Sequence, residues 1–469
     1  MGETVKSQPL ARRLGWPLLQ RLERGSSLAA LLAILALANT AHGDSVLLGP
    51  TPRPHAVRAQ LDPSLPTGAE RWSQLDLGKV GRLRCSPGRP LCVGSFSATE
   101  GHAAAALAAL ETAWNHLVID LGLPEPRSSD SGEPLTWVLE PTSRSTLGVL
   151  LRPRLGLPFD SASVVCRSGA NNPRLDLERD AHLCVGEGIA ARLDAGETPR
   201  NRRAYALSLW WSLGKPRDRD VQAIADSAHR DWQSPLGRDD IENAPLTALL
   251  LEYFDRVRGT AAIDATQTGL FALSAQHSDP SAPRYQNDPD VFDVLRRSLD
   301  DDHAKLAQMW RSWAVARALL AQRTGALARL GWVGDLGRLE PAWTLPVSSL
   351  PRRIAPTFPL APLGMVAVRV PIDQPLDHQM LGLQVAWEPP SAFVWTVLKL
   401  GPGDREMGRI DLAYQQRATM AEQRLVLDPK VESLLILGIN LGGIDLVHPP
   451  DPDHAPFEAH GCTVYLARL

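Results

Sequence analysis

Residues 363–469 alternate between short runs of branched or aromatic residues and turns, and this pattern constrains the fold more than any other feature. Runs such as AFVWTVLKL and LLILGIN have the length of strands and are rich in residues that favour β-sheet. Seven such runs, separated by turns such as GPGD, predict a β-sandwich. We therefore expect an all-β domain at residues 363–469.

The part of the chain before this domain carries start and stop signals of helices. Ser97–Glu100 reads SATE, a capping box that predicts a helix from there to about Leu121. Thr198 and Pro199 are typical of an N-cap and a first helical turn. Because strand-like runs such as LTWVLE stand between these helices, we expect an α+β, mainly helical domain at residues 96–340.

Two further segments have the composition of connections. Residues 341–362 contain six prolines and an arginine pair, which predicts a Pro-rich linker between the two domains. Residues 44–95 are polar and contain proline without a sustained hydrophobic period. We expect them to form an extended lead-in that ends in a small disulfide loop.

The N-terminus has the pattern of an export signal. Four arginines precede the apolar run LAALLAILALA at residues 28–38, and small residues follow at Ala41 and Gly43. A helix of this run would be about 16 Å long, about half the thickness of a bilayer core. We expect a signal peptide at residues 1–43, no stable membrane anchor after its removal, and a location in the periplasm or outside the cell.

The charge of the chain argues against some classes of partner. Residues 1–43 hold five of the 49 basic and two of the 52 acidic residues, so their removal takes the formal net charge from −3 to −6. A chain of this charge, without a persistent basic cluster, is not expected to bind nucleic acid or anionic membranes. The sequence indicates no cofactor and names no partner.

Export makes the five cysteines informative. Cys85 and Cys92 bracket a Pro/Gly turn, and Cys166 and Cys184 flank a segment that leads from a predicted strand into a helix. We favour the pairs Cys85–Cys92 and Cys166–Cys184 among the three that four cysteines allow. Cys462 then remains as a small buried apolar residue.

The stretch AHLCVGEGIAARLDAGE, residues 181–197, raises the question of catalysis. A zincin helix places two histidines four residues apart around a glutamate, so that both bind one Zn²⁺ and the glutamate activates water. Here Gly186 and Ala190 stand where the histidines would, and only Glu187 remains. Neither of the two replaced positions offers a donor atom.

A structural interpretation accounts for the same residues. Asp180, Glu187 and Asp194 are spaced by seven and would share one stripe of a helix, which predicts a solvated acidic face. Gly186 and Gly188 each cost about 1 kcal/mol relative to alanine inside a helix. We expect a close approach by another backbone to compensate for this cost.

The order of the predicted elements carries a resemblance. A long helix ending AWNHLVIDLGLP, then strands, LCVGEGIAARLDAGETP and ALLLEYFDRV are similar to the catalytic domain of secreted bacterial zinc metallopeptidases of the gluzincin type. In that resemblance the third zinc ligand is a glutamate on the following helix, where Glu252 stands. It implies a zincin-like fold for about residues 95–330, with Glu187 and Glu252 as vestigial catalytic positions. The mature chain also looks like an uncharacterised family of exported bacterial proteins that often read CVGEAIA here.

A second group of candidate ligands precedes the last predicted strand. Carboxylates suit Ca²⁺ and imidazoles suit Zn²⁺, and the segment offers both. Its spacing matches no standard metal loop, and its prolines favour a rigid polar loop at the surface. The weak metal candidates are Asp445, His448, Asp451, Asp453 and His454.

The sequence leaves three functional classes open. The first is an exported, non-catalytic protein with a degenerate metallopeptidase domain and a binding or structural role at the cell envelope or outside. The second is an active secreted zinc metallopeptidase, or another hydrolase, whose ligands the sequence does not reveal. The third is carbohydrate or surface binding through the β-sandwich. We expect the first.

Export predicts a cleaved N-terminus. The intact mass of protein recovered from the periplasm or the medium should match a chain that starts at Asp44. A cytoplasmic product that keeps residues 1–43 would contradict the export signal and, with it, the reasoning behind the disulfides.

Overall fold

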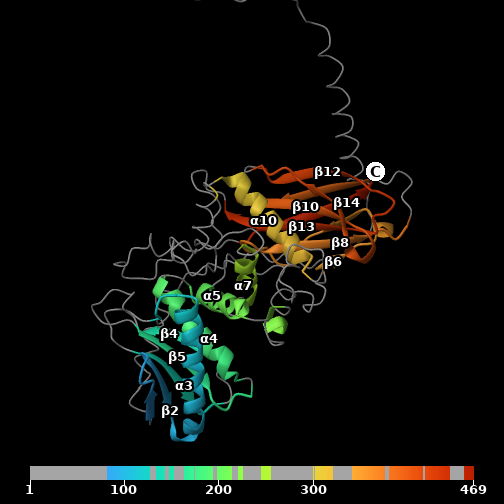
Figure 1. Ribbon diagram of the computed structural model, residues 1–469. Helices are drawn as coiled ribbons and strands as arrows, with labels where there is room; N and C mark the ends of the chain where they lie inside the picture. The colour runs from blue at the N-terminus through green and yellow to red at the C-terminus, as the bar shows by residue number, and fades with distance from the viewer. Residues whose placement is uncertain are drawn as a thin grey trace, which may run out of the picture. The chain divides into compact units, whose positions relative to one another are not determined.

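The computed structural model describes fourteen parts of the chain. They are residues 82–126, 134–142, 147–152, 163–173, 175–193, 198–213, 220–224, 244–254, 299, 302–320, 341–374, 380–415, 418–443 and 459–469. The expected signal peptide and its cleavage point therefore lie outside the described residues. Within them the protein is α+β, as expected (Figure 1).

The first sheet has five strands in the order β1-β2-β3-β5-β4. Its three central strands run parallel, and an antiparallel strand flanks them on each side. The parallel strands have the nearly continuous apolar runs of strands that are covered on both faces, such as LCVGS. The strands are β1 (Arg82–Cys85), β2 (Leu91–Ser95), β3 (Leu135–Glu140), β4 (Gly148–Arg152) and β5 (Ser163–Gly169).

The lead-in predicted for residues 44–95 differs from the structure at its described end. β2 is an inner strand of the first sheet, and the Cys85–Cys92 disulfide joins directly opposed residues of β1 and β2. The whole of β2 is buried. The disulfide loop is therefore a hairpin at one edge of the first sheet. Because residues 91–95 bury their side chains, they belong to the core of the domain that follows.

Helices pack on this sheet and on one another. α3 contacts β2 and α4, and α5 contacts both α4 and α7. The aliphatic residues of these helices form one core with the strands. Their bounds are α3 (Glu100–Trp114), its π-helical continuation η3 (Asn115–Asp120), α4 (Leu177–Leu193), α5 (Pro199–Ser212) and α7 (Ala244–Glu252).

The helix signals were largely correct. The Thr198 hydroxyl caps α5 by accepting from the Asn201 N–H at 3.2 Å, with Pro199 in the first turn. The start of α3 differs from the SATE prediction, since a short 3-10 turn, η2 (Ser97–Thr99), precedes the helix. The side-chain hydrogen bond that closes this turn is made by the Thr99 hydroxyl, which accepts from the Phe96 N–H at 2.9 Å.

The C-terminal part is a β-sandwich. One sheet has the order β11-β10-β13-β8-β6 and the other β12-β9-β14-β7, and apolar residues of both form a common core. All seven strands expected from the sequence are present. They are β8 (Met365–Pro371), β9 (Met380–Trp387), β10 (Ser391–Leu400), β11 (Glu406–Asp411), β12 (Met420–Val426), β13 (Ser433–Gly443) and β14 (Cys462–Arg468).

A helix covers the other face of the larger sheet. α10 (His303–Ala318) lies along β10 and β13 (Figure 1), and Arg311 of α10 donates to the Leu412 carbonyl at 2.9 Å. Trp310 and Trp313 of this helix are buried. The larger sheet is therefore buried on both faces, which explains why every residue but one of β10 is apolar or buried.

The segment 341–362 is more than the predicted linker. It contains β6 (Trp343–Thr344), which pairs with β8, and β7 (Arg352–Ile354), which pairs with β14. Each of these short strands is at the end of its sheet. Proline removes a backbone donor and is tolerated at sheet edges, so a Pro-rich sequence can still supply edge strands.

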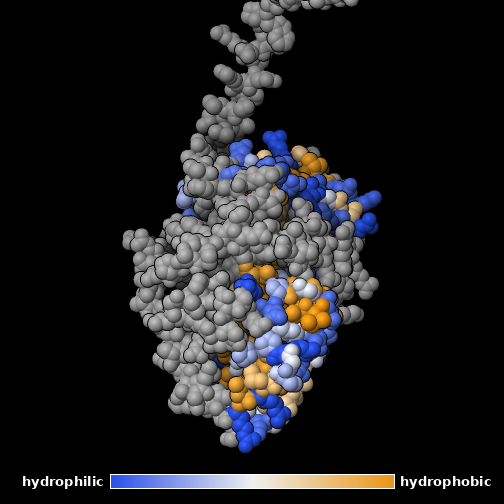
Figure 2. All heavy atoms as spheres, turned by 60° about the vertical axis from the view of Figure 1, so that its left-hand side comes forward, coloured by the Kyte–Doolittle hydropathy of each residue, from blue (hydrophilic) through white to orange (hydrophobic). Residues whose placement is uncertain are grey.

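The exposed apolar residues of the described chain are dispersed. On the face in Figure 2 they appear as separate orange patches among polar residues. Such dispersion is ordinary for a protein surface. None of the described helices combines the length and the apolarity that a membrane crossing requires. The large exposed apolar residues include Leu83, Ile119, Phe358 and Met420.

Candidate functional site

Helix α4 carries the stretch that resembles a zincin motif, and it is buried along most of its length. A Cβ at Gly186 would lie 3.0 Å from Cα and 2.9 Å from Cβ of Ala206 on α5. A Cβ at Gly188 would lie 2.7 Å from the Pro126 side chain. The expected close approach of another backbone is found at Gly186, whereas Gly188 packs against side chains.

The acidic residues of α4 do not form the solvated face that their spacing predicted. Asp180 and Glu187 are only 5% and 1% exposed. Arg203 of α5 forms an ion pair with Glu187, and Arg179 pairs with Asp180. Buried charges need such partners. The seven-residue spacing predicted exposure to solvent, but contacts with arginines allow these two residues to be buried. Asp194 lies outside the described residues.

Arg203 ties three elements together. Its Nε donates to Glu187 Oε1 on α4, and its Nη2 donates to the Leu147 carbonyl just before β4, at 2.9 Å. Burial raises the pKa of Glu187, and the neighbouring Arg203 and Arg202 guanidinium groups oppose this shift. The motif glutamate is therefore used as an internal acceptor for an arginine.

The residues present do not fit a catalytic zinc ion. Gly186 and Ala190 offer no donor, both lie in the buried part of α4, and Glu187 is engaged by Arg203. Glu252, the other position that the resemblance implies, is the last residue of α7 and is also buried. α5 packs on both α4 and α7, and its Ser208 donates to the Ala248 carbonyl of α7. No catalytic step through a metal follows from this arrangement.

The remaining sequence candidates have different outcomes. Among the described residues, no three histidine, cysteine, aspartate or glutamate side chains gather so as to hold a metal ion. The C-terminal candidates, including His448 and His454, lie outside these residues. Both expected disulfides are formed, and Cys166–Cys184 ties β5 to α4. Cys462 is free and buried, and burial raises the pKa of its thiol to about 12, with a further contribution from Glu388.

A polar network lies near the start of α4. His182 contacts His116 of η3 on one side and the Trp210 ring of α5 on another, with ring centroids 4.9 Å apart for the latter pair. Trp210 Nε1 donates to Asp220 at 3.2 Å, and Arg179 Nε donates to the same carboxylate at 2.7 Å. The network joins η3, α4, α5 and the segment 220–224.

The sequence analysis missed two residues, Arg203 as the partner of Glu187 and His116 as the partner of His182. Arg203 stands in PRNRR at the start of α5, where arginines are ordinarily exposed. His116 lies in the segment AWNHLVIDLGLP, which was interpreted only as a helix end. The one available signal was the charge of α4 itself, because a largely apolar helix with several acids requires cations from its neighbours.

Comparisons with known proteins add little to this geometry. No family model and no curated protein matches the chain. A pre-peptidase C-terminal domain of collagenase from Bacillus anthracis aligns over 28% of this chain and 99% of its own length, at 7% identity and a TM-score of 0.18. PliG of Aeromonas hydrophila, a periplasmic inhibitor of g-type lysozyme, aligns over 26% and 95%, at 14% identity and a TM-score of 0.16. Scores this low support no inference of fold or function.

The close approach at Gly186 can be tested by adding one methyl group. Gly186→Ala should lower the free energy of unfolding by about 1–3 kcal/mol, because the added Cβ overlaps the backbone of Ala206. Gly101→Ala is the matched control, since nothing lies within 4 Å of its Cβ position in α3. The control should be neutral or stabilising by up to about 1 kcal/mol. Equal effects of the two changes in urea unfolding would disprove the packing role.

Proposed function

We propose that this is an exported, non-catalytic protein whose helical domain is a degenerate metallopeptidase and whose role is binding or structural, at the cell envelope or outside. The order of elements supports the comparison with zincins: a long helix, strands with an antiparallel edge strand, the motif helix and two further helices. The two disulfides support a location in an oxidising compartment.

One observation carries the non-catalytic part of the proposal. The side of α4 that bears Gly186 and Glu187 packs directly on Ala206 and Arg203 of α5. A catalytic zinc requires protein ligands and an open position for water or substrate. A close helix–helix contact occupies the place where such a position would have to be.

The ion pair also changes what Glu187 can do. A general base must reach the proton that it abstracts, and in a zincin that proton belongs to metal-bound water. Glu187 instead accepts from a guanidinium that cannot give up its proton. We infer that the glutamate is retained for packing, and that the surfaces of the two domains carry the function.

The test is metal and protease analysis of the full mature chain. After incubation with zinc and removal of the excess, zinc should remain far below one equivalent, and unfolded casein should not be cleaved. Glu187→Gln should leave both results unchanged.

One outcome would contradict the proposal, and a second must be distinguished from it. One equivalent of zinc, together with casein cleavage that Glu187→Gln abolishes, would identify an active enzyme. Zinc that is lost in a His448→Ala, His454→Ala double variant would come from the C-terminal loop and would leave the proposal intact, provided that casein stays uncleaved.

A further inference from the structure

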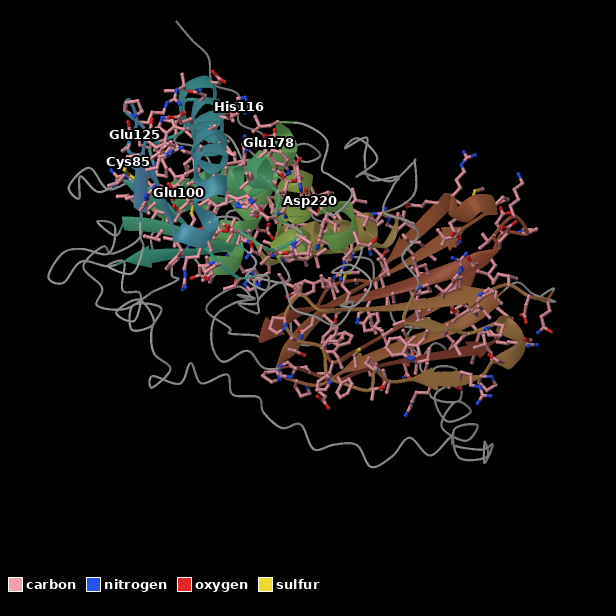
Figure 3. All side chains as sticks on the ribbon, turned by 90° about the horizontal axis from the view of Figure 1, so that it is seen from below. Cys85, Glu100, His116, Glu125, Glu178 and Asp220 are labelled. Atoms are coloured by element: carbon pink, nitrogen blue, oxygen red, sulfur yellow. A yellow bond between two sulfur atoms is a disulfide. The ribbon has the colours of Figure 1, made fainter. Side chains whose placement is uncertain are left out.

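Two histidines meet between the end of α3 and the start of α4. Nδ1 of His116, in the π-helical segment η3, lies 3.1 Å from Nε2 of His182 on α4. In Figure 3 the labelled His116 and Glu178 lie at the same end of these helices. π-helical turns are rare and are often found at functional positions. Here the π-helical turn carries the residue that forms the contact with α4.

The hydrogen-bond partners determine where the protons lie. His182 Nδ1 is 2.7 Å from the Glu178 carbonyl, which can only accept, so Nδ1 carries a hydrogen. A neutral His182 therefore presents a lone pair at Nε2. His116 Nδ1 must then donate to this lone pair. The other ring nitrogen of a neutral His116, Nε2, therefore carries a lone pair and can accept the first proton.

The pair responds differently to a first and to a second proton. A proton on His116 Nε2 keeps the bond to His182 and strengthens it, because the donor becomes charged. A proton on His182 Nε2 places two N–H groups and two positive charges face to face. His182 is 1% exposed and lies against Trp210, so its ring cannot turn towards solvent while the packing is kept.

The described charged groups around the pair are mostly carboxylates. On α4, Glu178 and the Arg179–Asp180 ion pair flank His182, and Asp220 takes a second contact from Arg179. α5 presents the Trp210 indole, and η3 presents the exposed Asp120. Asp220 is itself paired with Arg179, which limits how far it can compensate a second positive charge on the histidines.

We propose that His116 and His182 form an acid-sensitive joint that holds η3 on α4 in neutral solution and releases it when both rings are protonated. This inference goes beyond the proposed function and is independent of it. The second proton must break the hydrogen bond between the two rings. The release is therefore expected in acid.

Hydrogen exchange of the full mature chain tests the joint. Between pH 7.5 and 5.0, protection of residues 115–121, corrected for intrinsic rates, should fall about tenfold or more, as a loss of 1.4 kcal/mol would give. Protection of residues 183–190 should stay constant. In His116→Gln the fall should disappear, because an amide can donate to His182 or accept from it.

The matched control is His102→Gln, at an exposed position of the same helix α3, and it should behave as the unchanged chain. The proposal would be overturned if protection of residues 115–121 in the unchanged chain were the same at pH 7.5 and 5.0. This outcome does not depend on whether any variant folds. The same pH response in His116→Gln, in a variant whose near-ultraviolet circular dichroism at pH 7.5 is unaltered, would also overturn it.

Discussion

The buried ion pair between Glu187 and Arg203 is the contact on which the helical part of the structure depends. It joins α4 to α5, and the second arm of the same guanidinium reaches the chain just before β4. Removing one member of a buried pair leaves an uncompensated charge and typically costs about 3–5 kcal/mol. α4 is additionally tied to β5 by the Cys166–Cys184 disulfide and to η3 by the histidine pair.

The same contact bears on our proposal that a peptidase-like order of elements exists here without peptidase chemistry. A catalytic helix must expose part of one side to a cleft, whereas Gly186 brings α4 into backbone contact with α5. Arg203 then places a fixed positive charge beside Glu187, whose carboxylate would otherwise be available to metal-bound water. A fold and the chemistry of a site are separable, so on our proposal the zincin-like architecture is kept while the motif helix serves as a packing element.

The sequence predicted those features well that depend on residues close together in the chain, and missed those that depend on distant partners. Seven of the nine described strands of the sandwich and the Thr198 cap were predicted, because their sequence signals come from nearby residues. The burial of Glu187 was missed because it depends on an arginine sixteen positions away. β6 and β7 were hidden in a Pro-rich segment, since their pairing with β8 and β14 involves strands elsewhere in the sequence.

A double-mutant cycle on Glu187 and Arg203 tests this account most directly. Glu187→Gln, Arg203→Met and the double variant would be compared by the free energy of urea unfolding. We expect a coupling energy of about 1–3 kcal/mol, with the double variant less destabilised than the sum of the single variants. A coupling energy near zero, with single-variant losses below about 0.5 kcal/mol as at an exposed site, would contradict the claim that this pair seals α4 against α5.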